Sequence, residues 1–250
     1  DQSGPYGHQL VRGLHRAISE WGPADAPPLL VLHGFLEQGA AWHRVARALP
    51  HRRVVAPDHR GHGRSGHVGD GGFYHFWDYV ADVDAVIDDL GGGPIDLVGH
   101  SMGGTLAALV AACVPEKVRK LVLIEGLGPP DGAHRAVEQA RRALRQRRSP
   151  PTHRPIEDVD AAAARMRKGN PSLPHDSALA LAARQTRPDG DALTWTWDAL
   201  HRARSPQAFR ADQFLDFLAE IQAPTLMVEG ADSPYRQIPD LQARRDALGN

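Results

Sequence analysis

One serine of this chain stands in a setting that favours nucleophilic chemistry. Ser101 follows the short apolar run 95–98 and precedes the Ala-rich stretch 106–114. With Gly99 and Gly103 it forms the pattern G-x-S-x-G, which is typical of a serine on a sharp turn between a strand and a helix. Side chains at the two glycine positions would collide in so tight a turn. The pattern predicts that Ser101 attacks an acyl carbonyl once a base removes its proton.

The helix expected after Ser101 also supplies a hydrogen-bond donor. Met102 is the first residue of that helix. Its N–H therefore lies beside the place where the negative charge of a tetrahedral intermediate would form. The motif thus predicts a nucleophile together with one donor of an oxyanion hole.

Strands must end beside this turn in order to position it. Four compact apolar runs are of the kind that forms buried parallel strands. They cover residues 29–32, 53–56, 95–98 and 120–124. Helical periodicity lies between them at 41–49 and 76–90, and residues 9–21 are typical of one or two shorter strands. This alternation predicts an α/β fold, a mostly parallel sheet with helices on both faces.

The alternation of buried strands and helices stops at Gly126, and no further buried-strand run appears before about Asp212. Helix-like stretches replace the strands, at 133–148, 156–168, 177–186 and 206–209. We therefore expect a helical cap over the carboxyl edge of the sheet, inserted into the core. The expected division is a core part at 1–126, a cap at 127–212 and a second core part at 213–250.

Two features of the expected cap bear on a substrate. Residues 131–170 contain ten Lys/Arg and five Asp/Glu. We interpret this excess as a solvated helix face, with attraction of an anionic substrate or a membrane surface as the alternative. Trp195 and Trp197 either line a pocket or pack within the cap.

The composition excludes several classes of protein. The chain has 250 residues, of which 42% are hydrophobic, enough for a sizeable core. Its formal net charge of −1 gives no general attraction for nucleic acid, and no apolar run reaches membrane-spanning length. Cys113 is the single cysteine, so the chain has no internal disulfide and no Cys-based metal site. We expect no metal, no cofactor and a cytoplasmic location.

Five motifs, in this order, resemble those of the α/β-hydrolase fold family. Besides the serine motif, they are His33-Gly34-Phe35, the turn 58–65, and the strand ends 121–126 and 224–230. The resemblance covers residues 9–126 and 213–248, and residues 33–36 with 125–129 are similar to the serine-hydrolase-like branch with a helical cap. It implies that the Phe35 N–H completes the oxyanion hole with Met102. It also implies a serine hydrolase that cleaves a carboxylic ester or related small acyl substrate through an acyl-enzyme on Ser101.

The resemblance leaves two candidates for the acid of a catalytic triad. The family places this acid after the seventh strand, where Asp232 stands one residue early, or at the end of the sixth strand, where Glu125 stands. The family's base is a histidine after an eighth strand, and none of the 14 histidines occupies that place. We therefore expect that the last strand and the base are missing from this chain, and that turnover is weak or absent.

Other functions remain open on the same fold. A carbon–carbon bond hydrolase or a cofactor-free perhydrolase would use the same serine. A binding module without catalysis is the alternative from another class, although such a module does not need a complete serine turn and oxyanion loop.

Overall fold

A seven-stranded sheet forms the centre of the molecule in the computed structural model, which describes residues 6–69 and 71–249. Its strands are β1 (Tyr6–Val11), β2 (Leu14–Trp21), β3 (Pro28–Leu32), β4 (Arg53–Pro57), β5 (Ile95–His100), β6 (Val118–Ile124) and β9 (Thr225–Val228). Their order is β1-β2-β4-β3-β5-β6-β9. β2 runs antiparallel to β1 and β4, and the other neighbours are parallel. The mostly parallel sheet is as the sequence predicts.

The register of the central strands brings the motifs together. Leu32, at the end of β3, pairs with Gly99 of β5, and His100 pairs with Ile124 of β6. Because these strands are parallel, the segments that follow them leave the sheet at the same edge. The loop after β3, the serine turn and the end of β6 therefore meet.

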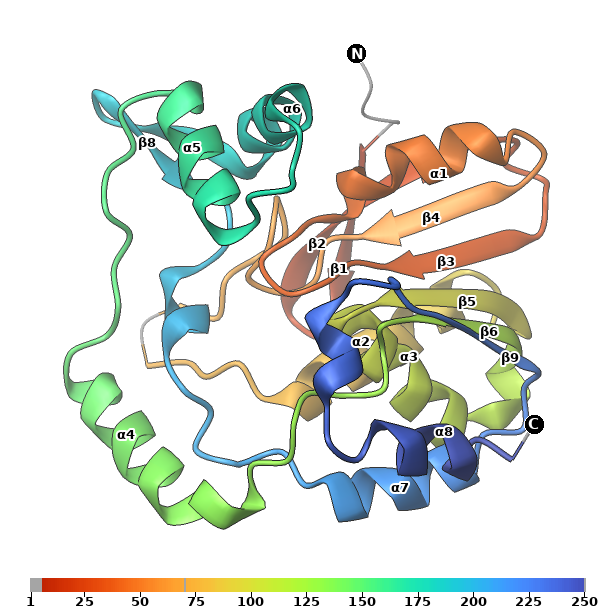
Figure 1. Cartoon of the computed structure of the whole chain (residues 1–250). Helices are drawn as coiled ribbons and strands as arrows, with labels where there is room; N and C mark the ends of the chain where they lie inside the picture. The colour runs from red at the N-terminus through yellow and green to blue at the C-terminus, as the bar shows by residue number, and fades with distance from the viewer. Residues whose placement is uncertain (1–5, 70, 250) are drawn as a thin grey trace.

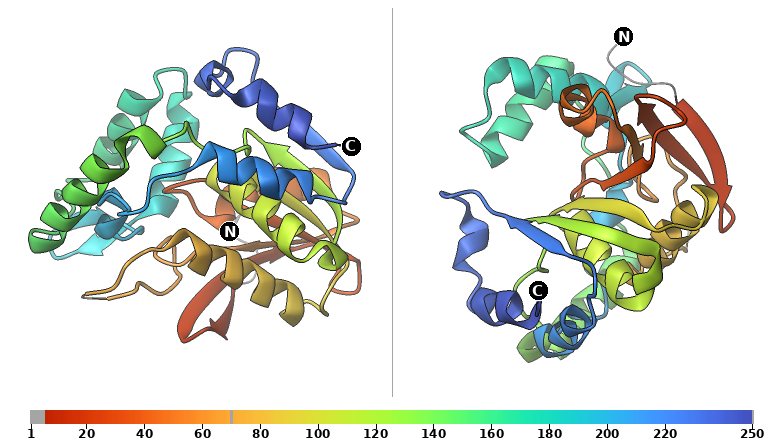
Figure 2. Two further views of the ribbon diagram at one scale, coloured as in Figure 1. Left: turned by 90° about the horizontal axis from the view of Figure 1, so that it is seen from below. Right: turned by 90° about the vertical axis from the view of Figure 1, so that its right-hand side faces the viewer.

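Helices cover both faces of the sheet (Figure 2). They are α1 (His43–Ala48), α2 (Phe76–Asp89), α3 (Met102–Cys113), α7 (Ala211–Ala219) and α8 (Leu241–Ala247). Trp42 and Ala46 pack with Val31 and Val54 on one face, and the larger apolar core lies under the other helices. Every residue of α3 from 103 to 111 is buried, which explains why it is rich in alanine and glycine.

The segment from 127 to 210 adds no strand to the large sheet. It contains α4 (Ala136–Arg148), α5 (Val159–Gly169), α6 (His175–Gln185), β7 (Thr186–Asp189) and β8 (Ala192–Trp195). Figure 1 shows it, coloured green to cyan, at the end toward which the arrows of β3 and β4 point. We propose residues 127–212 as a cap over this edge of the sheet.

Two expectations for this segment were wrong. β7 and β8 form an antiparallel hairpin, so the segment is not purely helical. The Asp189-Gly190 turn, in which Gly190 has a φ of 60°, and the alternation of Leu193 and Trp195 with threonines were the signals for it. Residues 206–209 are not a helix, since four residues, of which Pro206 is the first, are too few for a stable one.

β9 lies at one edge of the sheet and is poorly covered. The side chains of Leu226, Met227 and Val228 are 60%, 37% and 41% exposed. One side of β9 pairs with β6. No further strand pairs with its other side among the described residues.

Candidate active site

Ser101 stands on the sharp turn that the sequence predicts. It has a φ of 51° and a ψ of −115°, a backbone conformation that is rare for a residue with a side chain. A Cβ at Gly99 would lie 2.3 Å from the Gly103 carbonyl oxygen, and one at Gly103 would lie 2.4 Å from the Leu32 oxygen. Both glycines are therefore needed where helix α3 crosses the ends of β3 and β5.

The turn is anchored to the neighbouring strand. The Ser101 N–H donates to the Ile124 carbonyl at 2.8 Å, and the Thr105 N–H donates to the Ser101 carbonyl at 3.0 Å. The Ser101 hydroxyl makes no hydrogen bond to another described residue, so it is available to a substrate.

A cavity of about 1000 Å³ opens beside this turn. Phe35 and Met102, whose N–H groups are the expected oxyanion donors, both line it. Part of the remaining lining is aromatic, with side chains from the loop before α2, from α2 itself and from α7. These aromatic residues are Phe73, Phe76, Trp77, Tyr79, Phe214 and Phe217. Such a wall suits an apolar acyl group.

Another part of the cavity lining comes from the cap and carries charges of both signs, with Asp131 and Glu138 beside the arginines. Arg135, Arg142, Arg202 and Arg204 line it, and no carboxylate of the described residues lies within ion-pair distance of any of them. Arg147 lies over the Phe73 ring, 3.2 Å from its centroid. Part of the basic excess seen in the sequence therefore faces the cavity rather than forming only a solvated helix face.

The two candidate acids have different surroundings. Glu125 follows β6 with a φ of 50°, and its Oε1 accepts the Gly230 N–H at 3.0 Å. It comes directly after Ile124, the residue bonded to Ser101. Asp232 is exposed, and its carboxylate makes no hydrogen bond to the rest of the described chain. Glu125 is thus adjacent to the serine turn, whereas Asp232 lies beyond the edge strand β9.

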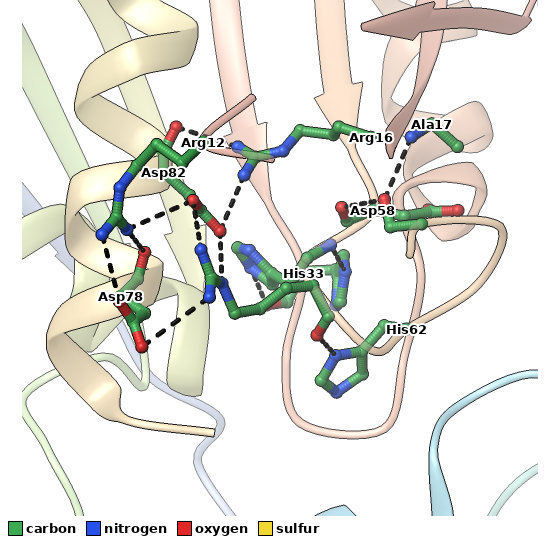
Figure 3. Close-up of polar contacts among 11 residues, drawn as sticks. Arg12, Arg16, Ala17, His33, Asp58, His62, Asp78 and Asp82 are labelled. Carbon is green, nitrogen blue, oxygen red and sulfur yellow. Dashed lines mark hydrogen bonds and ion pairs between the residues drawn. The ribbon is translucent and has the colours of Figure 1, made fainter. Parts of the chain in front are cut away.

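No histidine side chain among the described residues is hydrogen-bonded to Ser101. His33 and His59 tie loops together instead: the His59 N–H donates to His33 Nε2 at 2.9 Å. His62 Nδ1 lies 3.0 Å from the Arg60 carbonyl (Figure 3). Burial lowers the pKa of all three rings well below the ordinary value, so they are neutral at neutral pH. His59 and His62 are buried.

The turn 58–65 supports the loop after β3. The Asp58 carboxylate accepts the Gly39 N–H at 2.7 Å and the Arg64 N–H at 2.8 Å. Gly63 must be glycine, because a Cβ there would lie 2.1 Å from Asp58 Oδ2. The Ser65 hydroxyl donates to the Asp58 carbonyl at 2.6 Å. The motif in the sequence therefore marks a structural support beside the site.

A buried ion-pair network holds this turn against α2 (Figure 3). Asp82 of α2 accepts hydrogen bonds from Arg60 Nε and Nη2, both at 2.6 Å, and Arg16 Nη2 lies 2.7 Å from it. All three side chains are at most 8% exposed.

Contacts with the cap complete the wall of the cavity, and sequence reasoning missed them. The Tyr74 hydroxyl donates to Asp198 at 2.7 Å, and the Asp198 N–H donates to the Gly61 carbonyl at 2.7 Å. His201 Nε2 lies 3.0 Å from the same carbonyl, and the ring lines the cavity. Burial lowers the pKa of His201 to about 4. No local pattern signals these residues, because they meet only through the tertiary fold.

Two other features have no counterpart among the described residues. None of their helices has the length and apolar character needed to cross a membrane. They also contain no group of three or more His, Cys, Asp or Glu side chains arranged to hold a metal ion.

Comparison with known proteins finds relatives whose names are those of hydrolases. A serine hydrolase-like protein of Danio rerio is 30% identical over 90% of this chain and 72% of its own length. Lipase LipV of Mycobacterium tuberculosis is 38% identical over 50% of this chain, which corresponds to 46% of LipV. The thioesterase domain from the curacin biosynthetic pathway has a solved structure that covers 98% of this chain and 89% of that domain, with 36% identity and a TM-score of 0.89.

The family model for the alpha/beta hydrolase fold matches residues 27–243. This range contains the loop after β3, the turn 58–65, the serine turn and the end of β6, which meet at one edge of the sheet. With serine hydrolase-like, lipase and thioesterase proteins among its relatives, the chain belongs to the α/β-hydrolase fold family.

Proposed function

We propose that this chain is a serine hydrolase that cleaves carboxylic esters or thioesters through an acyl-enzyme on Ser101. The observation that carries the proposal is the backbone of Ser101, which has a φ of 51° at the junction of β5 and α3. The hydroxyl would attack the acyl carbonyl, and the N–H groups of Phe35 and Met102 would bind the resulting oxyanion. Both of these residues line the cavity beside the serine turn.

We infer that Glu125, rather than Asp232, is the acid that would orient a base. Glu125 is adjacent to the strand residue bonded to Ser101, and the Gly230 N–H fixes its carboxylate. Asp232 has no such support in its exposed loop. Because no described histidine is bonded to Ser101, Glu125→Gln and Asp232→Asn would be compared with imidazole added as an external base, and we expect the larger loss of acylation rate for Glu125→Gln.

The lining of the cavity supports a substrate class. The aromatic wall suits an apolar acyl chain, and four arginines without a carboxylate partner among the described residues suit an anionic group on the same substrate. We propose thioesters as substrates in addition to esters because the thioesterase domain described above is 36% identical to this chain.

The central test is the Ser101→Ala variant. Both proteins would be treated with a fluorophosphonate probe, and the labelled residue identified by mass spectrometry. We expect labelling at Ser101 and none in the variant. Turnover should be slow, since no described histidine is bonded to Ser101 and only the oxyanion hole and binding then contribute, about 10³–10⁴-fold over water. A Ser101→Ala protein that keeps full esterase and thioesterase activity would contradict the proposal.

A substrate panel would separate the alternatives. We expect an ester or thioester of a dicarboxylic acid to react faster than the equally long monocarboxylic one, and Arg142→Gln to reduce this preference. Val137→Gln, on the same helix but outside the cavity lining, is the matched control. Hydrolysis of a diketone alone, or peroxide-dependent turnover alone, would indicate a carbon–carbon bond hydrolase or a perhydrolase instead.

A further inference from the structure

Glu37 and His100 form an ion pair directly beside the proposed nucleophile. His100 is the last residue of β5, next to Ser101, and its Nδ1 lies 3.3 Å from Glu37 Oε2. Glu37 belongs to the loop after β3, and the same oxygen accepts the Gly34 N–H at 2.9 Å. One carboxylate oxygen therefore joins the loop that carries Phe35 to the turn that carries Ser101.

The loop after β3 depends on such an anchor. Leu36 has a φ of 60°, a left-handed conformation that a leucine keeps only where surrounding contacts impose it. The Glu37 N–H donates to the Gly34 carbonyl at 3.2 Å and closes the turn. A Cβ at Gly34 would lie 2.9 Å from His100 Nδ1 and 3.0 Å from Glu37 Oε2. The ion pair thus packs directly against the Gly34 backbone.

The surroundings favour the charged forms of both side chains. The hydrogen bond with Glu37 raises the pKa of His100, burial opposes this, and the charge of Glu125 adds to the increase. Burial alone would raise the pKa of Glu37, but His100, the Gly34 N–H and a smaller contribution from His33 outweigh it and lower that pKa. The pair is therefore ionised between these two pKa values.

We propose that Glu37 and His100 are positioning residues whose ion pair fixes the Gly34–Phe35 peptide, so that the Phe35 N–H faces the oxyanion formed at Ser101. This inference rests on the proposed function, because it assumes that Ser101 is acylated. Neither residue is among those that line the cavity, and their side-chain hydrogen bonds are with each other and with the Gly34 backbone. No hydrogen bond joins His100 to Ser101 among the described residues, so we assign His100 a positioning role and not that of the base.

The first experiment measures acylation of Ser101 by a fluorophosphonate probe in the Glu37→Gln and His100→Gln variants. We expect the maximal acylation rate to fall about tenfold to a hundredfold, which is less than the 10²–10³-fold typical of a lost oxyanion donor. The probe concentration that gives half of this rate should stay unchanged. Glu20→Gln, which removes the partner of Arg53 on a distant strand, is the matched control and should label at the normal rate.

The pH dependence distinguishes this role from a general loss of structure. The contribution of the Glu37–His100 ion pair to the acylation rate is present below the raised pKa of His100 and is lost as the pH rises through that pKa. It is also lost as the pH falls through the lowered pKa of Glu37. The ratio of parent to Glu37→Gln rates should therefore be largest between the two pKa values and fall above the higher of them. An equal ratio at every pH, or equal rates, would overturn the inference.

A second readout does not depend on acylation. In nuclear magnetic resonance spectra, Glu37→Gln should lower the pKa of the His100 ring and speed hydrogen exchange of the Phe35 amide. An unchanged exchange rate of the Phe35 amide would overturn the positioning role even if the variant is acylated slowly. If the parent protein does not label at Ser101 while His100 and Phe35 respond as described, the proposed function fails and the fixing of the loop stands.

Discussion

Gly104 and Gly126 determine, at the scale of single residues, how closely helix α3 approaches the end of β6. A Cβ at Gly104 would lie 2.5 Å from the Gly126 Cα, and one at Gly126 would lie 2.6 Å from the Gly104 Cα. Both contacts are with backbone atoms, which cannot rotate away as a side chain can. The spacing between these elements sets the position of Ser101, because its N–H is bonded to Ile124, two residues before Gly126.

We therefore expect Gly104→Ala to lower both stability and the reactivity of Ser101. Forcing one methyl group into a close-packed contact typically costs about 1–3 kcal/mol. Chemical denaturation would measure the loss of stability, and fluorophosphonate labelling of Ser101 would measure the loss of reactivity.

Gly169→Ala is the matched control for this prediction. Gly169 is the last residue of α5, and a Cβ there would meet nothing within 4 Å. It should leave stability unchanged or raise it slightly, since alanine restricts the unfolded chain. Equal effects of the two substitutions would contradict the role of the Gly104 contact.

Individual residues were predictable from the sequence where a short pattern defines them. Ser101 and its glycines lie within five positions, so local sterics identify the turn. His100 and Glu37 are 63 positions apart, and Tyr74 and Asp198 are 124 apart. Nothing local links the members of these pairs, and only the folded sheet and cap bring them together.

Helix α2 shows, at the scale of elements, how a charged residue can hold a turn in place. Its apolar stripe packs on the core, yet Asp82 also lies on the buried side and is 2% exposed. Arg16 from β2 and Arg60 from the turn 58–65 both contact its carboxylate. Asp82 therefore links a helix, a strand and the turn that supports the loop after β3.

Asp82→Asn should be strongly destabilising. Asparagine keeps the shape but leaves two buried guanidinium groups without a full countercharge, and breaking a buried pair typically costs about 3–5 kcal/mol. Urea unfolding would measure this loss. Asp84→Asn on the same helix, which removes one partner of Lys117 at the surface, should have a much smaller effect. Similar losses of stability for the two variants would show that the buried ion-pair network stabilises the protein no more than the surface pair does.

The elements themselves followed from the sequence where their pattern is long. The buried runs of β3, β4, β5 and β6 and the periodicity of α2 predicted the core correctly. The β7–β8 hairpin was missed because its strands have only four residues each, and β7, with the sequence Thr-Arg-Pro-Asp, has no apolar alternation. Such short strands resemble loop sequence until their turn, Asp189-Gly190, is recognised.

The whole molecule combines a sheet whose order brings the site together with the segment 127–212, which we propose as a cap. β3 and β5 are neighbours although β4 lies between them in sequence, so the loop after β3 reaches the serine turn directly. The alternation of strands and helices predicted this class of fold. It did not predict which arginines of the cap face the cavity, because that depends on how the cap packs on the core.

Among the described residues β9 is an edge strand, and this has a consequence for the behaviour of the 250-residue chain at high concentration. An apolar strand with free backbone groups is a template for strand addition by another molecule, and charged side chains at such edges oppose it. We expect Leu226→Lys to raise the concentration at which light scattering first reports aggregation. Val137→Lys removes a comparably exposed side chain, 65% against 60%, but from a helix. It should change this threshold much less, so that self-association follows the unpaired backbone of β9 rather than apolar exposure in general.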